Sequence, residues 1–218
     1  MSRRAVAALL ALLTITAGCS ALTGNPTVFI AGQVSVSEAA QSETGYSLQE
    51  KRTLNSSRTF AGQEVKVVNH LGEYARAADL PVFGDTEIAR FTVFATPVVE
   101  VAGQGPFNPV ADLNNTELVL RLQEQYESIS NVQRVGNRTE TMLGTETSVG
   151  KFRADARTTA GKETEVSIHI TKVRHEGDFV IAVAVYPTQL ENGQQNVNRL
   201  LAGVQHSGRD GGGSETSA

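Results

Sequence analysis

Four histidines are the side chains of this chain best suited to acid–base chemistry or metal binding: His70, His169, His175 and His206. None lies in a His-Glu-x-x-His motif, and the sequence has neither a Gly-x-Ser-x-Gly motif nor a phosphate-binding loop with Lys-Ser/Thr. His169 and His175 fall on one predicted strand or at its end, but the sequence identifies no third ligand beside them. We therefore expect surface histidines, with no catalytic residue, no bound metal and no cofactor.

The single cysteine owes its meaning to its position. Cys19 follows the small pair Ala17-Gly18 at the end of an apolar run, Ala5–Thr16, which begins after Arg3-Arg4. This order is typical of a secretory signal with a lipid-attachment site, and the run is shorter than the roughly 20 residues of a membrane-spanning helix. The alternative, a lone buried thiol in an uncleaved N-terminus, leaves the order unexplained. The sequence thus predicts a signal peptide at residues 1–18, cleavage before Cys19 and a diacylglyceryl-type lipid on its sulfur.

The composition indicates a globular domain. Hydrophobic residues make up 40% of the chain and charged residues 19%, which is enough apolar material for a packed core. The formal net charge is −4, and a negative chain of this kind is not expected to bind nucleic acid. The length predicts one domain at residues 27–206, after a lipidated tether at 19–26 and before a polar, glycine-rich disordered tail at 207–218.

Apolar patterns predict several strands. They fall within residues 28–36, 46–68, 88–101 and 132–186, and the last range holds four of them. Phe179–Tyr186 is apolar throughout, which indicates a central strand covered on both faces. Pro97 removes a ladder donor and marks an edge, a bulge or a break in its strand.

Two helices are expected to flank this sheet. Asn114 stands three residues before Glu117 in a capping-box pattern, at the start of an apolar helical face over residues 114–129. A second helix is predicted over residues 190–205. If the segment Asn69–Tyr74 is also helical, His70 and Tyr74 share one face as a packed surface pair. The predicted fold class is α+β, an antiparallel β-sheet flanked by helices.

The order of several segments resembles an uncharacterised family of haloarchaeal lipoproteins. The likeness covers nearly the whole mature chain, and its segments are the lipobox, Asn69-His70-Leu71, Phe107–Val110, Gln125-Tyr126, Leu143-Gly144 and Asp178–Pro187. It implies an archaeal lipid anchor and an extracellular location at the cell membrane, and it supplies no known activity. The element order alone is similar to the PsbP/LpqN-like α-β-α sandwich. That likeness implies an accessory or binding module.

Three asparagines begin Asn-x-Ser/Thr tripeptides, at which an exported protein could carry glycans. They are Asn55, Asn114 and Asn137. Asn137 is the best acceptor, because it follows Gly136 in a predicted turn, whereas Asn114 is engaged by the helix cap.

Two functions are considered. The first is a non-catalytic binding or assembly module that is held to the membrane through Cys19 and meets a protein partner at the cell surface. Its binding loop would be Gly103–Pro109, in which prolines stiffen the chain around Phe107 and Asn108; the alternative is that Phe107 plugs the end of the core. The second function is a surface hydrolase whose active site has no local motif. We expect the first, and hence no enzyme.

Overall fold

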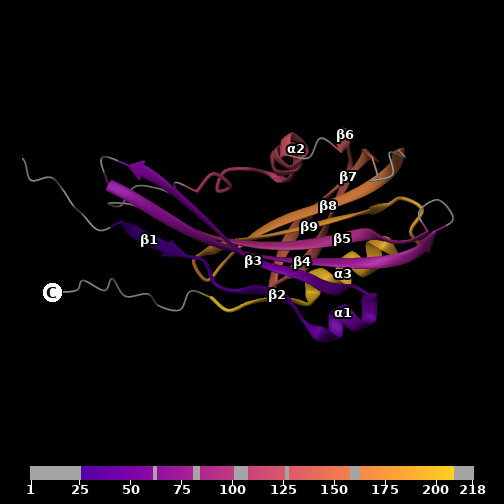
Figure 1. The fold of residues 1–218 in the computed structure, drawn as a ribbon, viewed down its shortest axis with the longest axis horizontal. Coiled ribbons are helices and arrows are strands. Elements are labelled where there is room, and N and C mark those ends of the chain that lie inside the picture. Colours follow the sequence, from indigo (N-terminus) through magenta and orange to yellow (C-terminus); the bar gives the residue numbers. More distant parts are fainter. Residues whose placement is uncertain are drawn as a thin grey trace, which may run out of the picture.

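The computed structural model describes residues 26–60, 63–80, 84–100, 108–125, 128–157 and 163–208. These residues form a large mixed sheet, a small two-stranded sheet and three helices (Figure 1). The strands are β1 (Thr27–Ile30), β2 (Val34–Val36), β3 (Ser47–Phe60), β4 (Gln63–Leu80), β5 (Gly84–Pro97), β6 (Ile129–Met142), β7 (Thr145–Arg157), β8 (Glu163–His175), β9 (Asp178–Pro187) and β10 (Val204–His206). The helices are α1 (Glu38–Thr44), α2 (Asn115–Gln125) and α3 (Gly193–Ala202).

The large sheet consists of two antiparallel halves that meet where β5 pairs with β9. Strands β3, β4 and β5 form one half, and β6 to β9 form the other in chain order. Strand β1 runs parallel to β4, beside Val65–Val68, so the sheet is mixed. The strand order β1-β4-β5-β9-β8-β7-β6 places β9 in the middle. Most of β9 is buried, which confirms the prediction of a central, covered strand.

Each face of the sheet has its own hydrophobic core. Figure 1 shows α2 on one side of the sheet and α1 and α3 on the other. Leu118 and Val119 of α2 pack with Phe152 and its neighbours, and Leu200 and Leu201 of α3 belong to the second, larger core. Because successive residues of a strand point to opposite faces, β5, β8 and β9 contribute side chains to both cores.

The predicted fold class, an α+β antiparallel sheet flanked by helices in a PsbP/LpqN-like α-β-α sandwich, is wrong. The structure is mostly β, and its helices are short elements on a large sheet of long strands. The segment Asn69–Tyr74 is the middle of β4, and His70, Gly72 and Tyr74 alternate toward one face with the period of a strand. The helix predicted over residues 190–205 ends at Ala202, and its last residues instead form β10. Long-range strand pairing, which local patterns do not encode, overrides these local expectations.

Two local predictions are confirmed. Asn114 and Glu117 form a capping box: Asn114 Oδ1 accepts from the backbone N–H of Thr116 at 2.9 Å and of Glu117 at 3.1 Å, and Glu117 Oε2 accepts from the Asn114 N–H at 2.7 Å. Pro97 is the last residue of β5, where the chain leaves the sheet.

The small sheet ties the two ends of the domain together. Strand β10 pairs with β2 in antiparallel register from Val204↔Val36 to His206↔Val34. The Ser207 N–H then donates to the Gln33 carbonyl at 3.0 Å. This pairing brings His206 to the end of the β8–β9 hairpin.

Among the described residues, no helix has the length and apolar character needed to cross a membrane.

Candidate functional site

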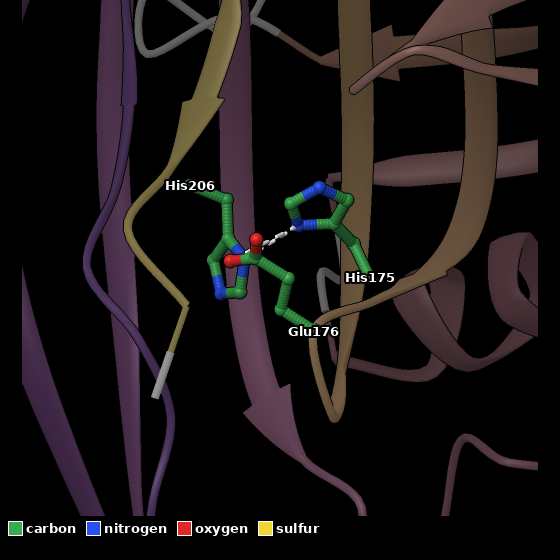
Figure 2. Close-up of side chains that lie close together, drawn as sticks. All are labelled: His175, Glu176 and His206. Atoms are coloured by element: carbon green, nitrogen blue, oxygen red, sulfur yellow. Dashed lines mark hydrogen bonds and ion pairs between the residues drawn. The ribbon is translucent and has the colours of Figure 1, made fainter. Parts of the chain in front are cut away.

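The candidate site lies where the β8–β9 hairpin meets β10. His175 ends β8, Asp178 begins β9, and Glu176-Gly177 forms the turn between them. His206 is the last residue of β10. Figure 2 shows the His175 and His206 rings and the Glu176 carboxylate turned toward one another. The pairing of β10 with β2 therefore adds a histidine from the end of the domain to a hairpin about 30 residues earlier.

The turn holds Glu176 in a backbone conformation that its residue type disfavours. Both turn residues have left-handed backbone angles, with φ of 46° at Glu176 and 85° at Gly177. A two-residue hairpin of this kind favours Asn or Asp before Gly, whereas Glu pays a steric cost there. The Glu176 side chain is 57% exposed, so core packing does not explain its presence. A strained residue that is not held by packing is a candidate for a functional role.

Asp178 is the most firmly held residue of the cluster that it forms with His175, Glu176 and His206. Its side chain is fully buried, and Oδ2 accepts the backbone N–H of Gly32 at 2.7 Å. The same oxygen lies 3.0 Å from Nε2 of His206, whose side chain is also fully buried. A carboxylate only accepts hydrogen bonds, so Nε2 of His206 carries the proton. In neutral His206 the lone pair is then on Nδ1.

That lone pair faces the second histidine. Nδ1 of His206 lies 3.0 Å from Nδ1 of His175, and the two rings meet edge to face, with an interplanar angle of 74°. Nδ1 of His175 is in turn 3.9 Å from Oε2 of Glu176. Two ring nitrogens at this separation need a proton or a cation between them, because two lone pairs repel. The arrangement therefore directs a nitrogen pair and a carboxylate at one point.

Two glycines make room for these side chains. A Cβ at Gly32 would lie 2.8 Å from Nε2 of His206, and one at Gly208 would collide with the Glu176 carboxylate. Gly208 also has a left-handed φ of 67°, which other residues rarely adopt. The close approach of backbone to His206 and Glu176 thus depends on residues before and after the hairpin.

His70 stands at the margin of the cluster. Its ring contacts Gln33 Nε2 at 3.2 Å and Thr53 Oγ1 at 3.3 Å. Burial lowers the pKa of His70, and the nearby Asp178 carboxylate opposes that shift. His70 and His206 are therefore both within the electrostatic reach of the buried Asp178 carboxylate.

The fourth histidine, His169, belongs to a separate, buried hydrogen-bond network. Nδ1 of His169 accepts from Nη1 of Arg138 at 2.6 Å, and Nε2 lies 2.8 Å from the Tyr186 hydroxyl. Burial first, and then the charges of Arg138 and Lys151, lower the pKa of His169 to about 3. His169 is 1% exposed and neutral, and it packs in the larger-core face of the sheet.

The sequence placed His169 and His175 on one strand, and this is confirmed. They lie six positions apart along β8, which is about 20 Å at about 3.3 Å per residue, so they do not share a site. The prediction of surface histidines is wrong for His70 and His169, which are buried, and for the His206 side chain, which is fully buried. No site role was predicted for Asp178 or Glu176. The usable signal was Glu in place of Asn or Asp before Gly177.

The other predicted site residues are distributed as follows. Cys19 and Phe107 lie outside the described residues. Asn108 is buried: its Nδ2 donates to Thr96 Oγ1 at 2.8 Å and to the Pro97 carbonyl at 2.7 Å, so it fastens the chain to the end of β5. Asn55 and Asn137 are exposed. Asn137 lies within β6, opposite Gly150, and not in the predicted turn.

The exposed Asn114 keeps its Oδ1 in the helix cap. The three acceptor asparagines remain predictions as glycosylation sites.

Comparison with known proteins gives a family. Residues 33–205 match the family described as a domain of unknown function, DUF6517. The chain belongs to this family. The DUF6517 match contains His175, Glu176 and Asp178 and ends one residue before His206.

Other comparisons add little. No curated protein matches the chain. Among solved structures, the DUF6517 chain is similar to PA94, a protein of unknown function from Pseudomonas aeruginosa, with 9% identity, a TM-score of 0.28, and coverage of 62% of this chain and 83% of that one. A likeness this distant carries no functional argument.

Proposed function

We propose that this chain is a lipid-anchored protein on the extracellular face of the cell membrane, of haloarchaeal type, and that it works as a non-catalytic binding module. Two observations support the proposal. The order of basic, apolar and small residues before Cys19 supports the anchor. The cluster of His175, His206, Glu176 and Asp178 supports the binding role.

The anchor would hold the domain near the membrane. Strand β1 begins at Thr27, eight residues after Cys19. Eight extended residues reach at most about 30 Å. A diacylglyceryl group supplies two buried chains, and two chains give stable anchoring where one is marginal. The histidine cluster would therefore work within a short distance of the lipid surface.

The contacts of the cluster favour binding over catalysis. A hydrolytic triad needs a nucleophile within hydrogen-bond reach of its base. In the part of the chain that the structure describes, the polar contacts of His175 and His206 are each other, Glu176 and Asp178. Among these described residues, no hydroxyl or thiol lies within hydrogen-bond distance of either ring. The alternative, a surface hydrolase, gains no support from this geometry.

The first test removes the lipid-attachment atom. Cys19→Ser is expected to prevent lipid attachment, so that the folded domain is released or an uncleaved precursor accumulates. Membrane fractionation and intact mass measure both effects, with Ser20→Ala as the matched control that keeps the cysteine. A Cys19→Ser protein that fractionates with membranes at the mature wild-type size would overturn the anchor.

A further inference from the structure

We propose that the His175–Glu176–His206 cluster binds one divalent transition-metal ion of the Zn²⁺ class, through Nδ1 of each histidine and a carboxylate oxygen of Glu176. This inference rests on the proposed binding role of the cluster and names its ligand. The three ligand atoms lie within 4.8 Å of one another.

The spacing suits a single ion. An ion about 2.0–2.1 Å from each ligand in tetrahedral geometry places ligand atoms about 3.3–3.5 Å apart. The two nitrogens are 3.0 Å apart, and Nδ1 of His175 is 3.9 Å from Oε2 of Glu176, so the two separations bracket that value. All three ligand atoms lie within 4.8 Å of one another, and the Glu176 side chain, which is 57% exposed, has room to rotate toward the ion.

The protonation pattern also suits a metal. Asp178 holds the proton of His206 on Nε2, so the lone pair on Nδ1 is available to coordinate a metal ion. A carboxylate behind a ligating histidine fixes its tautomer and strengthens its lone pair, as in many zinc sites. Asp178 is itself anchored by the Gly32 N–H at 2.7 Å, so the ring is held before any ion arrives. Asp178 is thus a positioning residue and Glu176 a direct ligand.

The ligand set selects the class of ion. Two imidazole nitrogens and one carboxylate suit Zn²⁺, Co²⁺, Ni²⁺ or Cu²⁺, whereas Mg²⁺ and Ca²⁺ prefer sites made of oxygen atoms. Glu176 is exposed and the His206 side chain is fully buried, so the ion would enter from the Glu176 side. Three protein ligands leave one tetrahedral position for water or for a donor atom of a partner.

The site joins two parts of the fold. Its ligands come from the β8–β9 hairpin and from β10, the strand that closes on β2. An ion bound there links these elements in the folded chain only, and ligands that bind only the native state raise its stability. At a free ion concentration about 100-fold above Kd, Tm should rise by about 5–10 °C.

The experiment uses the full mature chain without a histidine tag, purified in detergent and treated with chelator. Isothermal titration with Zn²⁺ should show one ion per chain, and Mg²⁺ should give no heat of binding. Co²⁺ should give the visible absorption of a tetrahedral centre. His175→Ala should weaken Zn²⁺ binding by at least about 100-fold and Glu176→Gln by at least about tenfold, because loss of a direct ligand should cost no less than the roughly 10–100-fold lost with a partner behind a ligand.

Controls separate loss of the site from loss of the fold. His70→Gln keeps the three ligands and should bind Zn²⁺ as wild type does, and Glu146→Gln is the matched control for an exposed glutamate. Glu176→Gln changes an exposed turn residue and should leave the circular dichroism spectrum unchanged.

The inference is overturned if folded wild type binds none of the four ions at submillimolar concentration, or if folded His175→Ala and Glu176→Gln bind Zn²⁺ as tightly as wild type. Either result leaves the Cys19→Ser fractionation untouched, so the anchor and the metal site fail independently.

Discussion

His169 and His175 lie on the same strand and point toward the same face of the sheet, yet His169 has a cationic partner and His175 lies beside a carboxylate. The guanidinium of Arg138 donates to His169 at 2.6 Å and occupies its Nδ1 lone pair. The Nδ1 atom of His175 instead faces the nitrogen of His206 and the carboxylate of Glu176. One histidine is closed to cations and the other is surrounded by groups that attract them. The difference shows that partner charge, and not residue type or strand, decides what a histidine here can do.

Removal of the Asp178 carboxylate, which holds His206 beside His175, should have the largest effect on stability. Asp178→Ala leaves two buried donors, the Gly32 N–H and Nε2–H of His206, without their acceptor. We expect the free energy of unfolding to fall by about 3–5 kcal/mol, measured by urea denaturation. Asp178→Asn keeps one oxygen acceptor and should lose less. A loss below about 1 kcal/mol for the alanine variant would show that Asp178 does not organise the cluster.

The second largest effect should be a loss of folding stability in acid that is caused by the buried His169. The pKa of His169 is lowered to about 3 in the folded chain. Between about pH 6.5 and pH 3, His169 is therefore protonated in the unfolded chain but not in the folded chain. Stability from this group is therefore present above pH 6.5 and is lost as pH falls, by about 3 kcal/mol at pH 4.

Urea denaturation at pH 7 and pH 4 measures this loss. In His169→Gln, which can still accept from Arg138 and donate to Tyr186, the pH dependence should be smaller by that amount. An identical pH dependence in the two proteins would show that His169 titrates normally.

The two hairpin turns allow the finest test. Glu176-Gly177 and Leu143-Gly144 both place a non-glycine residue at positive φ, but Leu143 packs against the larger core. Because Asn tolerates this conformation better, Glu176→Asn should stabilise the chelator-treated protein by up to about 1 kcal/mol. Leu143→Asn should destabilise it by about 1 kcal/mol through lost packing. Urea denaturation of both variants checks the opposite signs, and equal signs would remove the argument that Glu176 is kept at a cost to stability.

Local features of the fold could be predicted from the sequence. The capping box of Asn114 and Glu117 spans three residues, and the apolar run of β9 marks a central strand without reference to its partners. The α-β-α sandwich was wrong because the extended course of Asn69–Tyr74 depends on pairing with β3 on one side and β5 on the other. Such pairings join residues far apart in sequence, and local propensity carries little information about them.

The candidate site depended on such distant contacts almost entirely. His206 lies 28 residues from Asp178, and Gly32 lies 146 residues from it. Nothing in the sequence near His206 indicates that the chain turns from helix α3 into β10 and meets β2. Only the hairpin half, His175 to Asp178, was contiguous, and its one local sign was a glutamate where a turn favours asparagine.

The pairing of β10 with β2 also sets an order of events during synthesis. Chains are made from the N-terminus, and a domain generally folds as a unit. Strand β2 and Gly32 emerge before any strand of the β6–β9 half, while His206 follows every strand of the large sheet. All strands of the large sheet, and Asp178 with them, are therefore made before the second imidazole. A chain that ends before residue 206 has no histidine pair, so it cannot capture an ion there.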